Sequence, residues 1–460
     1  MKVVFFVLLV STLLVKITQA HDYAIRGNLI SPSVLKWLDK FHLKYAYNVT
    51  TPNKQRVWLT TQIFCEVENF EPHKCFEMST NTSGGKDTQN KLLFSTVNVD
   101  MTINGVRFQG SYKVYTVTYA TDLSHQGFCL MSASAFAHGF SPNVLGQGRQ
   151  AEFDRGFTTN ERLWSVQRLV EEIYHSTVKK ELERTVILYV DAYDILFTNT
   201  VSALVKKLLR AQTSVIFGGE KGCCGVKEEL AWKRAPCAPK WMLPDTKTAT
   251  PYLNAGSFVG FVSETRDLLA RSRQAYHWFL SDIEAKFGPI EPVTGTRGPF
   301  DPYMMAGDQQ LLCDALPLFK YGQTNISLGI DYKSSIFLNA YRMQMGREIV
   351  LENKHRRVVY NPEKADCMGI NQKELGLLCE SSTQFAGGKR FPVTLHFNGP
   401  ASDKDRMIEV ARQMHWPRMG QDVLWNKTLF SVLPGKYITV KEQCDRHLVD
   451  FGLQSIYPVL

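Results

Sequence analysis

Two aspartates three positions apart, Asp191 and Asp194, follow the apolar run "VILYV". A short apolar run of this kind is typical of a strand that is buried on both faces. Two carboxylates within one turn repel each other unless a cation lies between them. Carboxylate oxygens suit Mg²⁺ or Mn²⁺, which can also hold a diphosphate. Because aspartates also cap turns, these two residues alone leave a metal site and a capped turn as alternatives.

Three later segments contain further candidate residues. "PYLNAGSFVGF" places small residues between apolar ones, so that either a sugar approaches the backbone closely or the strand packs tightly. "AGDQQLL" sets Asp308 at the start of a helix-like run, where an N-cap is the ordinary role. "FPVTLHFNGP" ends a strand at His396, and a lone histidine at a strand end is usually structural. Each segment taken singly therefore has a structural interpretation beside the chemical one.

The elements that position these residues alternate between strand and helix from about Tyr112. A strand "YKVYTVTYATD", a helix over 160–182, the strand "VILYV", a helix "TVSALVKKLLRAQ" with Thr200 as N-cap, and a strand "SVIFGGE" follow in order. Apolar strands that alternate with helices predict an α/β fold with a mainly parallel sheet. In such sheets ligands bind beyond the carboxyl ends of the strands, which is where both aspartates fall.

The composition narrows the class of protein. The chain has 460 residues with 44% hydrophobic content, enough for one large or two medium globular domains. The formal charge of +9 is spread along the chain, and its longest basic cluster is "KHRR" at 354–357. Because the basic blocks of nucleic-acid binders are missing, we expect no nucleic-acid partner and only a general attraction for anionic ligands.

The N-terminus and the cysteines indicate the secretory pathway. Residues 1–20 have a basic Lys2, an apolar run and Ala20 before His21, which predicts a signal peptide, with a signal anchor as the alternative. No later stretch is long and apolar enough for a transmembrane span. We therefore expect a location in the lumen of the endoplasmic reticulum or Golgi, or secretion.

Two further features agree with this compartment. Sequons for glycosylation occur at Asn48, Asn81, Asn325 and Asn426. The ten cysteines should mostly pair, with Cys65–Cys75 and Cys367–Cys379 as the nearest candidate pairs. The absence of a CxxC spacing argues against a zinc site.

Taken together and in order, these segments resemble the glycosyltransferase domain of the procollagen lysyl hydroxylase and collagen glycosyltransferase family. The family pattern runs Asp-Ser-Tyr-Asp, Leu-Asn-Ser-Gly-Gly-Phe-Ile-Gly, Asp-Gln-Leu and His-Gly-Asn-Gly-Pro. The counterparts here are "DAYD", "LNAGSFVG", "DQQL" and "HFNGP". "TVTYATD" is similar to the first nucleotide-binding strand, and "YKSSIFLN" to Lys-Ser-Arg-Ile-Phe-Gln-Asn. The resemblance covers about 112–402.

The resemblance implies a GT-A type, Rossmann-like α/β fold that uses a UDP-sugar with Mn²⁺ (or Mg²⁺). The expected organisation is a signal peptide at 1–20, an N-terminal extension at 21–109, the GT-A domain at 110–402 and a C-terminal tail at 403–460 that packs on it. The chain ends about sixty residues beyond "HFNGP", so a stand-alone transferase without the family's hydroxylase domain is expected.

Carried over by position, the resemblance also implies roles for individual residues. The metal ligands would be Asp191, Asp194 and His396. The nucleotide sugar would be bound by Thr118, Tyr193, Asp191 and Gly399. The residues at the reacting bond would be Asn254 and Asp308, the latter as a stabiliser of an oxocarbenium-like centre or as a proton acceptor. Arg162 and Arg168 are candidates to assist the departing diphosphate.

Departures from the family pattern limit what can be carried over. Glu220 and Cys223 are retained, but Cys224 stands where the family has tryptophan, and the acidic run before Asp-Gln-Leu is reduced to Gly307-Asp308. The identities of donor and acceptor are therefore left open.

The favoured function is transfer of a hexose from a UDP-sugar to a hydroxyl of a protein or glycan acceptor, with a hydroxylysine-linked, collagen-like acceptor among the candidates. An inactive, secreted glycosyltransferase-like binding protein is the alternative. An iron-dependent oxygenase with a His/Asp/His triad is a third possibility. Its His-X-Asp spacing is missing from the histidines that follow the signal segment.

Overall fold

The computed structural model consists of two compact units, residues 1–91 and 92–460. The described residues are 47–50, 56–59, 63–68, 71–77, 92–147, 159–222, 248, 250–273, 308–321, 326–352, 357–364, 389–399, 401–414, 426–432 and 435–449. The expected signal peptide, two of the sequons (Asn81 and Asn325) and the Cys367–Cys379 pair lie outside them. No helix in the described ranges combines the length and apolar character needed to cross a bilayer.

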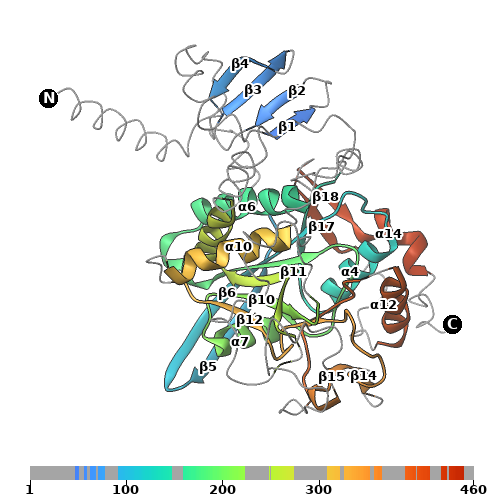
Figure 1. The fold of residues 1–460 in the computed structure, drawn as a ribbon. Helices are drawn as coiled ribbons and strands as arrows, with labels where there is room; N and C mark the ends of the chain where they lie inside the picture. The colour runs from blue at the N-terminus through green and yellow to red at the C-terminus, as the bar shows by residue number, and fades with distance from the viewer. Residues whose placement is uncertain are drawn as a thin grey trace. The chain divides into compact units, whose positions relative to one another are not determined.

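The first unit contains a four-stranded antiparallel sheet in the order β1-β2-β3-β4 (Figure 1). Its strands are β1 (Tyr47–Thr50), β2 (Arg56–Leu59), β3 (Ile63–Glu68) and β4 (Glu71–Glu77). The register places Cys65 directly opposite Cys75, so the backbone brings together two cysteines that the sequence suggested as partners.

The second unit is built on one large sheet in the order β18-β17-β7-β6-β8-β11-β10-β13-β16-β9, with β5 added at β6 and β12 at β10. Its strands are β5 (Ser95–Ile103), β6 (Val106–Tyr119), β7 (Pro142–Leu145), β8 (Thr185–Asp191), β9 (Ile195–Phe197), β10 (Val215–Glu220), β11 (Tyr252–Phe261), β12 (Leu328–Asp331), β13 (Phe337–Asn339), β16 (Thr394–His396), β17 (Thr428–Ser431) and β18 (Lys436–Thr439). A separate hairpin pairs β14 (Ile349–Glu352) with β15 (Arg357–Tyr360).

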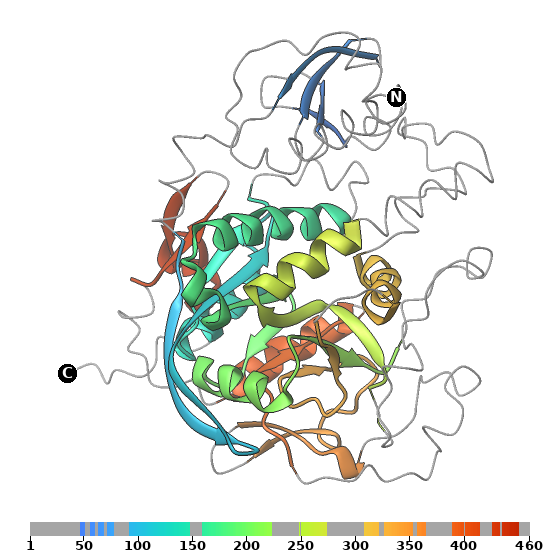
Figure 2. The ribbon, with the colours of Figure 1, turned by 90° about the vertical axis from the view of Figure 1, so that its left-hand side faces the viewer.

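Helices flank this sheet (Figures 1 and 2). They are α4 (Gln126–Ala137), α6 (Thr159–Ser176), α7 (Val201–Ala211), α10 (Asp308–Tyr321), α12 (Ala401–Gln413) and α14 (Val440–Val449), with short 3₁₀ turns at Lys179–Arg184 and Pro362–Lys364. Helix α6 contacts α10, whereas α4 contacts both α12 and α14. Thr200 caps α7 as predicted, because its hydroxyl accepts a hydrogen bond from the Ala203 amide at 3.2 Å.

The predicted mainly parallel core is present. Strands β7, β6 and β8 run parallel, as do β10, β13 and β16. Strand β11 lies between β8 and β10 and is antiparallel to both. Every residue of β8 before Asp191 is buried, as expected for a strand covered on both faces.

Two features extend the sheet beyond the segments that carry the family resemblance. The β5–β6 hairpin turns at Asn104-Gly105, both with positive φ, as an Asn-Gly hairpin turn requires. Strand β6 continues across residue 109, where the expected N-terminal extension ends. Strand β17 pairs in parallel with β7. A disulfide between Cys129 and Cys444 joins α4 to α14. The C-terminal residues 428–449 therefore belong to the same packed unit as the central strands.

Candidate active site

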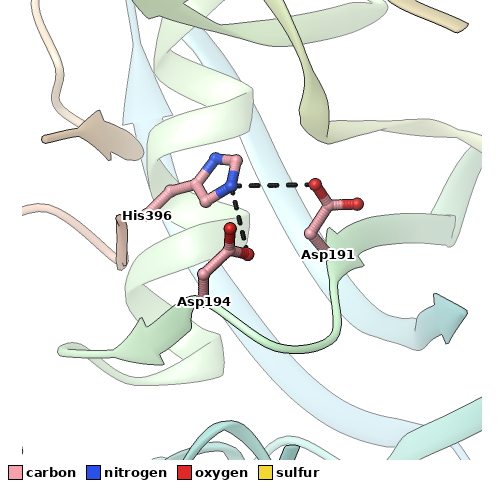
Figure 3. A group of neighbouring side chains, drawn as sticks. All are labelled: Asp191, Asp194 and His396. Carbon is pink, nitrogen blue, oxygen red and sulfur yellow. Dashed lines mark ion pairs between the residues drawn. The ribbon is translucent and has the colours of Figure 1, made fainter. Parts of the chain in front are cut away.

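Three sequence-predicted metal ligands meet at the carboxyl ends of the strands. Asp191 ends β8, Asp194 precedes β9, and His396 ends β16, which pairs with β9 so that His396 lies opposite Ile195. His396 Nε2 lies 3.7 Å from Asp191 Oδ2 and 3.4 Å from Asp194 Oδ1. Figure 3 shows the imidazole edge directed at both carboxylates. The three ligand atoms all lie within 4.8 Å of one another.

The hydrogen bonds of Asn339 fix the orientation of the His396 ring. The Asn339 amide nitrogen donates to the Gly219 carbonyl at 2.9 Å, so its oxygen Oδ1 faces His396 Nδ1 at 2.8 Å as an acceptor. Nδ1 therefore carries the proton in the neutral ring, and Nε2 presents its lone pair to the carboxylates. A hydrogen bond at the far nitrogen is the usual partner of a metal-binding histidine.

Gly256 leaves the space in which these ligands meet. A Cβ atom at this position of β11 would lie 2.3 Å from His396 Cε1 and 2.6 Å from Asp191 Oδ2. Any residue larger than glycine would therefore push two of the three ligands apart.

The charges at this site are strongly coupled. Burial lowers the pKa of His396, but the carboxylates of Asp194 and Asp191 outweigh burial and raise it overall. Burial raises the pKa of Asp194, and the neighbouring imidazole reverses that shift and holds it below the ordinary value. For Asp191, burial raises the pKa, and the attraction of Arg162 only partly offsets it. Two adjacent carboxylates and a histidine thus share a poorly solvated space.

The arrangement fits a divalent cation. His396 Nε2 is buried and faces the two carboxylates without a hydrogen bond. In the neutral ring its lone pair is therefore unsatisfied, which is costly for a polar atom unless a ligand satisfies it. The Nε2-to-carboxylate separations of 3.4 and 3.7 Å are close to the roughly 3 Å between neighbouring ligands of an octahedral ion such as Mg²⁺. Two carboxylates and one imidazole form a donor set suited to Mn²⁺ or Mg²⁺.

Asp308 and Arg162 adjoin the three ligands. Asp308 opens α10, and its Oδ1 accepts a hydrogen bond from the Gln309 amide at 2.9 Å. Arg162 in α6 donates from Nη1 to Asp191 Oδ1 at 2.9 Å and from Nη2 to Asp308 Oδ2 at 2.7 Å. Arg168 is exposed and donates to Ser165 in its own helix. Of the two cationic candidates, Arg162 is the one at the site.

A buried carboxyl lies beside Asn254. Glu220 accepts hydrogen bonds from Asn254 Nδ2 at 3.1 Å, from Gln309 Nε2 at 2.7 Å and from the amide of Asn398. Burial raises the pKa of Glu220 to about 7, although these three donors oppose the shift. Asn254 Oδ1 in turn accepts from the Gly256 amide at 3.0 Å. The sequence identified Glu220 only as a retained residue, because its partners come from three distant segments.

Two of the residues predicted to bind the nucleotide, Tyr193 and Thr118, have different surroundings. The hydroxyl of Tyr193 accepts from the backbone amides of Thr121 and Asp122 at 2.8 and 2.9 Å. Thr118 is fully buried within β6, and its hydroxyl has no hydrogen-bond partner. The strand ends at Tyr119, so Thr121, which the sequence did not single out, is the threonine beside Tyr193.

Gly399 follows the strand that carries His396. A Cβ atom there would lie 2.1 Å from Asp403 Oδ2 and 3.2 Å from the ring of Tyr341. Glycine at this position therefore permits the close approach of α12 to the turn.

The mixed α/β sheet with flanking helices is a GT-A type, Rossmann-like fold, as predicted. Residues 110–277 match the PLOD GT domain family. The chain is 23% identical over 237 residues to human "Multifunctional procollagen lysine hydroxylase and glycosyltransferase LH3", which covers 49% of this chain and 25% of that protein. It is 25% identical over 170 residues to mouse "Procollagen-lysine,2-oxoglutarate 5-dioxygenase 2", which covers 37% of this chain and 20% of the relative.

A Drosophila melanogaster relative, "Procollagen-lysine,2-oxoglutarate 5-dioxygenase", is 22% identical over 162 residues. The matched part of the chain spans a quarter or less of the length of these relatives. The matches support a glycosyltransferase domain of the PLOD family in this chain, and with it a glycosyltransferase-like function. The predicted resemblance to the glycosyltransferase domain of this family is confirmed over residues 110–277.

Proposed function

We propose that the protein is a metal-dependent glycosyltransferase that moves a hexose from a UDP-sugar to a hydroxyl on a protein or glycan acceptor. The observation that carries the proposal is the convergence of Asp191, Asp194 and His396, with a buried Nε2 that has no hydrogen-bond partner. An inactive binding protein gains nothing from two adjacent carboxylates whose burial is unfavourable without a cation.

Each side chain has a defined task in this reaction. Asp191, Asp194 and His396 would hold Mn²⁺ or Mg²⁺, which when bound stabilises the negative charge of the departing diphosphate as a Lewis acid. Tyr193, whose hydroxyl is held by the amides of Thr121 and Asp122, would contact the nucleoside. Asn254 and Asp308 lie beside the ligands, where the sugar would bind. A fixed carboxylate at Asp308 stabilises positive charge as it develops on the sugar carbon.

The acceptor and the compartment are part of the same proposal. The name of the human relative joins procollagen lysine hydroxylation to glycosyl transfer. A hydroxylysine-linked acceptor in the lumen of the secretory pathway would suit a chain with a signal-like N-terminus and a disulfide between Cys129 and Cys444.

The experiment is a panel of UDP-sugars incubated with the purified protein and Mn²⁺, with product analysis by mass spectrometry. Asp194→Ala and His396→Ala should abolish turnover and leave secretion intact. Asp100→Ala is the matched control, because Asp100 forms an exposed pair with Arg107 away from the site. Wild-type protein that turns over no UDP-sugar, or variants with undiminished turnover, would refute the proposal.

A further inference from the structure

The guanidinium of Arg162 joins two carboxylates that have different predicted tasks. Its Nη1 pairs with Asp191, a predicted metal ligand, at 2.9 Å, and its Nη2 pairs with Asp308, the predicted catalytic residue, at 2.7 Å. The three side chains are only 21%, 17% and 12% exposed. Ion pairs shielded to this degree are screened far less by salt than surface pairs.

The bridge determines which oxygen of each carboxylate remains available. Asp191 Oδ1 accepts from Arg162 and also from the Tyr189 hydroxyl at 3.2 Å. Its other oxygen, Oδ2, is the one that faces His396 Nε2. Asp308 Oδ2 is held by Arg162, and its Oδ1 by the Gln309 amide. Both carboxylates are thus fixed in rotation by donors that are not part of the metal-ligand set.

We propose that Arg162 is the positioning residue of this site: it ties Asp308 to the metal-ligand strand and turns Asp191 so that Oδ2 faces His396 Nε2, where the ion would bind. This inference rests on the proposed glycosyltransferase function. The planar guanidinium of arginine presents donors in a fixed geometry to two different carboxylates, whereas lysine offers a single point charge. Arginine at this position is therefore required for geometry as well as for charge.

Arg168 provides a matched control on the same helix. It is exposed, and its guanidinium donates a hydrogen bond to Ser165 in its own helix. Arg168→Met removes the same functional group from α6 without touching the carboxylates, so it reports any general effect of losing an arginine from this helix.

The test compares Arg162→Lys, Arg162→Met, Asp308→Asn, the double variant Arg162→Met/Asp308→Asn and Arg168→Met in the full chain. Turnover of UDP-sugar is measured together with the dissociation constant for Mn²⁺ from calorimetry. We expect Arg162→Lys to lose about 100-fold in kcat, the loss typical of a misplaced catalytic group. Its Mn²⁺ dissociation constant should rise by about 10-fold, because Asp191 loses the donor that orients its Oδ2 although all three ligands remain.

The double variant separates positioning from independent roles. If Arg162 acts through Asp308, the double variant should be no slower than the slower single variant, because the two losses are not additive. Kinetic losses that multiply in the double variant would overturn the proposal. Wild-type kcat or an unchanged Mn²⁺ dissociation constant in Arg162→Lys would overturn it as well.

Thermal unfolding of the same variants distinguishes failure of this inference from failure of the proposed function. Wild-type protein without turnover would refute the glycosyltransferase function itself. The contact between Arg162 and Asp308 can be tested even if the protein shows no turnover. The melting temperature of the double variant should then fall by less than the sum of the two single shifts, and additive shifts would overturn the inference.

Discussion

Substitution of Gly256 by alanine tests the metal site through its space rather than its ligands. The added Cβ would lie 2.3 Å from His396 Cε1 and 2.6 Å from Asp191 Oδ2, whereas ordinary contact begins at 3.4 Å. The two ligands must therefore yield by 1.1 Å (3.4 − 2.3) and 0.8 Å (3.4 − 2.6). His396 is held by Asn339 and by the strands on either side of β16, so its ring has little freedom to move.

Two effects of known size follow from this clash. Overpacking of a buried site typically lowers the free energy of unfolding by about 1–3 kcal/mol. Displaced ligands weaken metal binding by about 10–100-fold when their supporting contacts are disturbed, which corresponds to about 1.4–2.7 kcal/mol. We expect Gly256→Ala to show both effects.

The assay pairs urea unfolding with a calorimetric Mn²⁺ titration. Gly260→Ala is the matched control, because Gly260 lies in the same strand as Gly256. Its added Cβ would lie 2.7 Å from Val215 Cγ2 and 2.7 Å from Thr265 Oγ1. It should lower stability to a similar extent while leaving Mn²⁺ affinity unchanged. Equal Mn²⁺ affinity in the two variants would refute the location of the site.

Three further outcomes are expected. Asn339→Ala removes the acceptor of His396 Nδ1, and Mn²⁺ should bind about 10–100-fold more weakly by calorimetry; unchanged affinity would refute the orienting role of Asn339. The pKa of Glu220 is raised from 4.5 to about 7, so between these pH values the native state keeps a proton that the unfolded chain releases. The free energy of unfolding, relative to that of Glu220→Gln, should therefore be highest below pH 4.5 and fall by about 3 kcal/mol as the pH rises from 4.5 to 7. A pH-independent difference between the two proteins in urea unfolding would contradict this. Lys221→Met removes the lysine that pairs with buried Glu348 at 2.8 Å, so the free energy of unfolding should fall by about 3–5 kcal/mol. Lys113→Met, at the half-exposed pair with Glu181, should lower it by at most about 1 kcal/mol. Equal losses in the two variants would show that the buried pair contributes no more to stability than the exposed one.

The central strands and the first two ligands could be predicted from local patterns. The apolar run "VILYV" can only be a buried element, and its end fixes where Asp191 and Asp194 lie. The cap at Thr200 and the helix start at Asp308 are likewise local signals.

Other features depend on contacts between distant segments and could not be predicted. The chain alone gives no sign that β11 runs antiparallel between two parallel strands, or that Cys129 pairs with Cys444 across 315 positions. Glu220 receives its donors from three separate segments. Because a carboxylate can pair with any basic residue that the fold brings near, only the structure distinguishes Arg162 from Arg168.

The placement of Thr118 shows the limit of a motif match within a strand. "TVTYATD" contains three threonines, Thr116, Thr118 and Thr121, and the motif alone does not say which of them faces a nucleotide. The strand register with β8 places Thr118 opposite Val190, inside the sheet, and Tyr119 opposite Asp191 at its edge. The end of the strand determines which threonine lies beside Tyr193. The residue types of the segment do not reveal where the strand ends.

The most direct measurement is anomalous diffraction at the manganese edge from crystals of the protein with Mn²⁺ and UDP. A single strong peak is expected about 2.2 Å from Asp191 Oδ2, Asp194 Oδ1 and His396 Nε2, the distance usual for oxygen and nitrogen ligands of such ions, with the UDP phosphates bound to the same ion. A manganese peak elsewhere, or no peak between these three side chains, would contradict the assignment of the site.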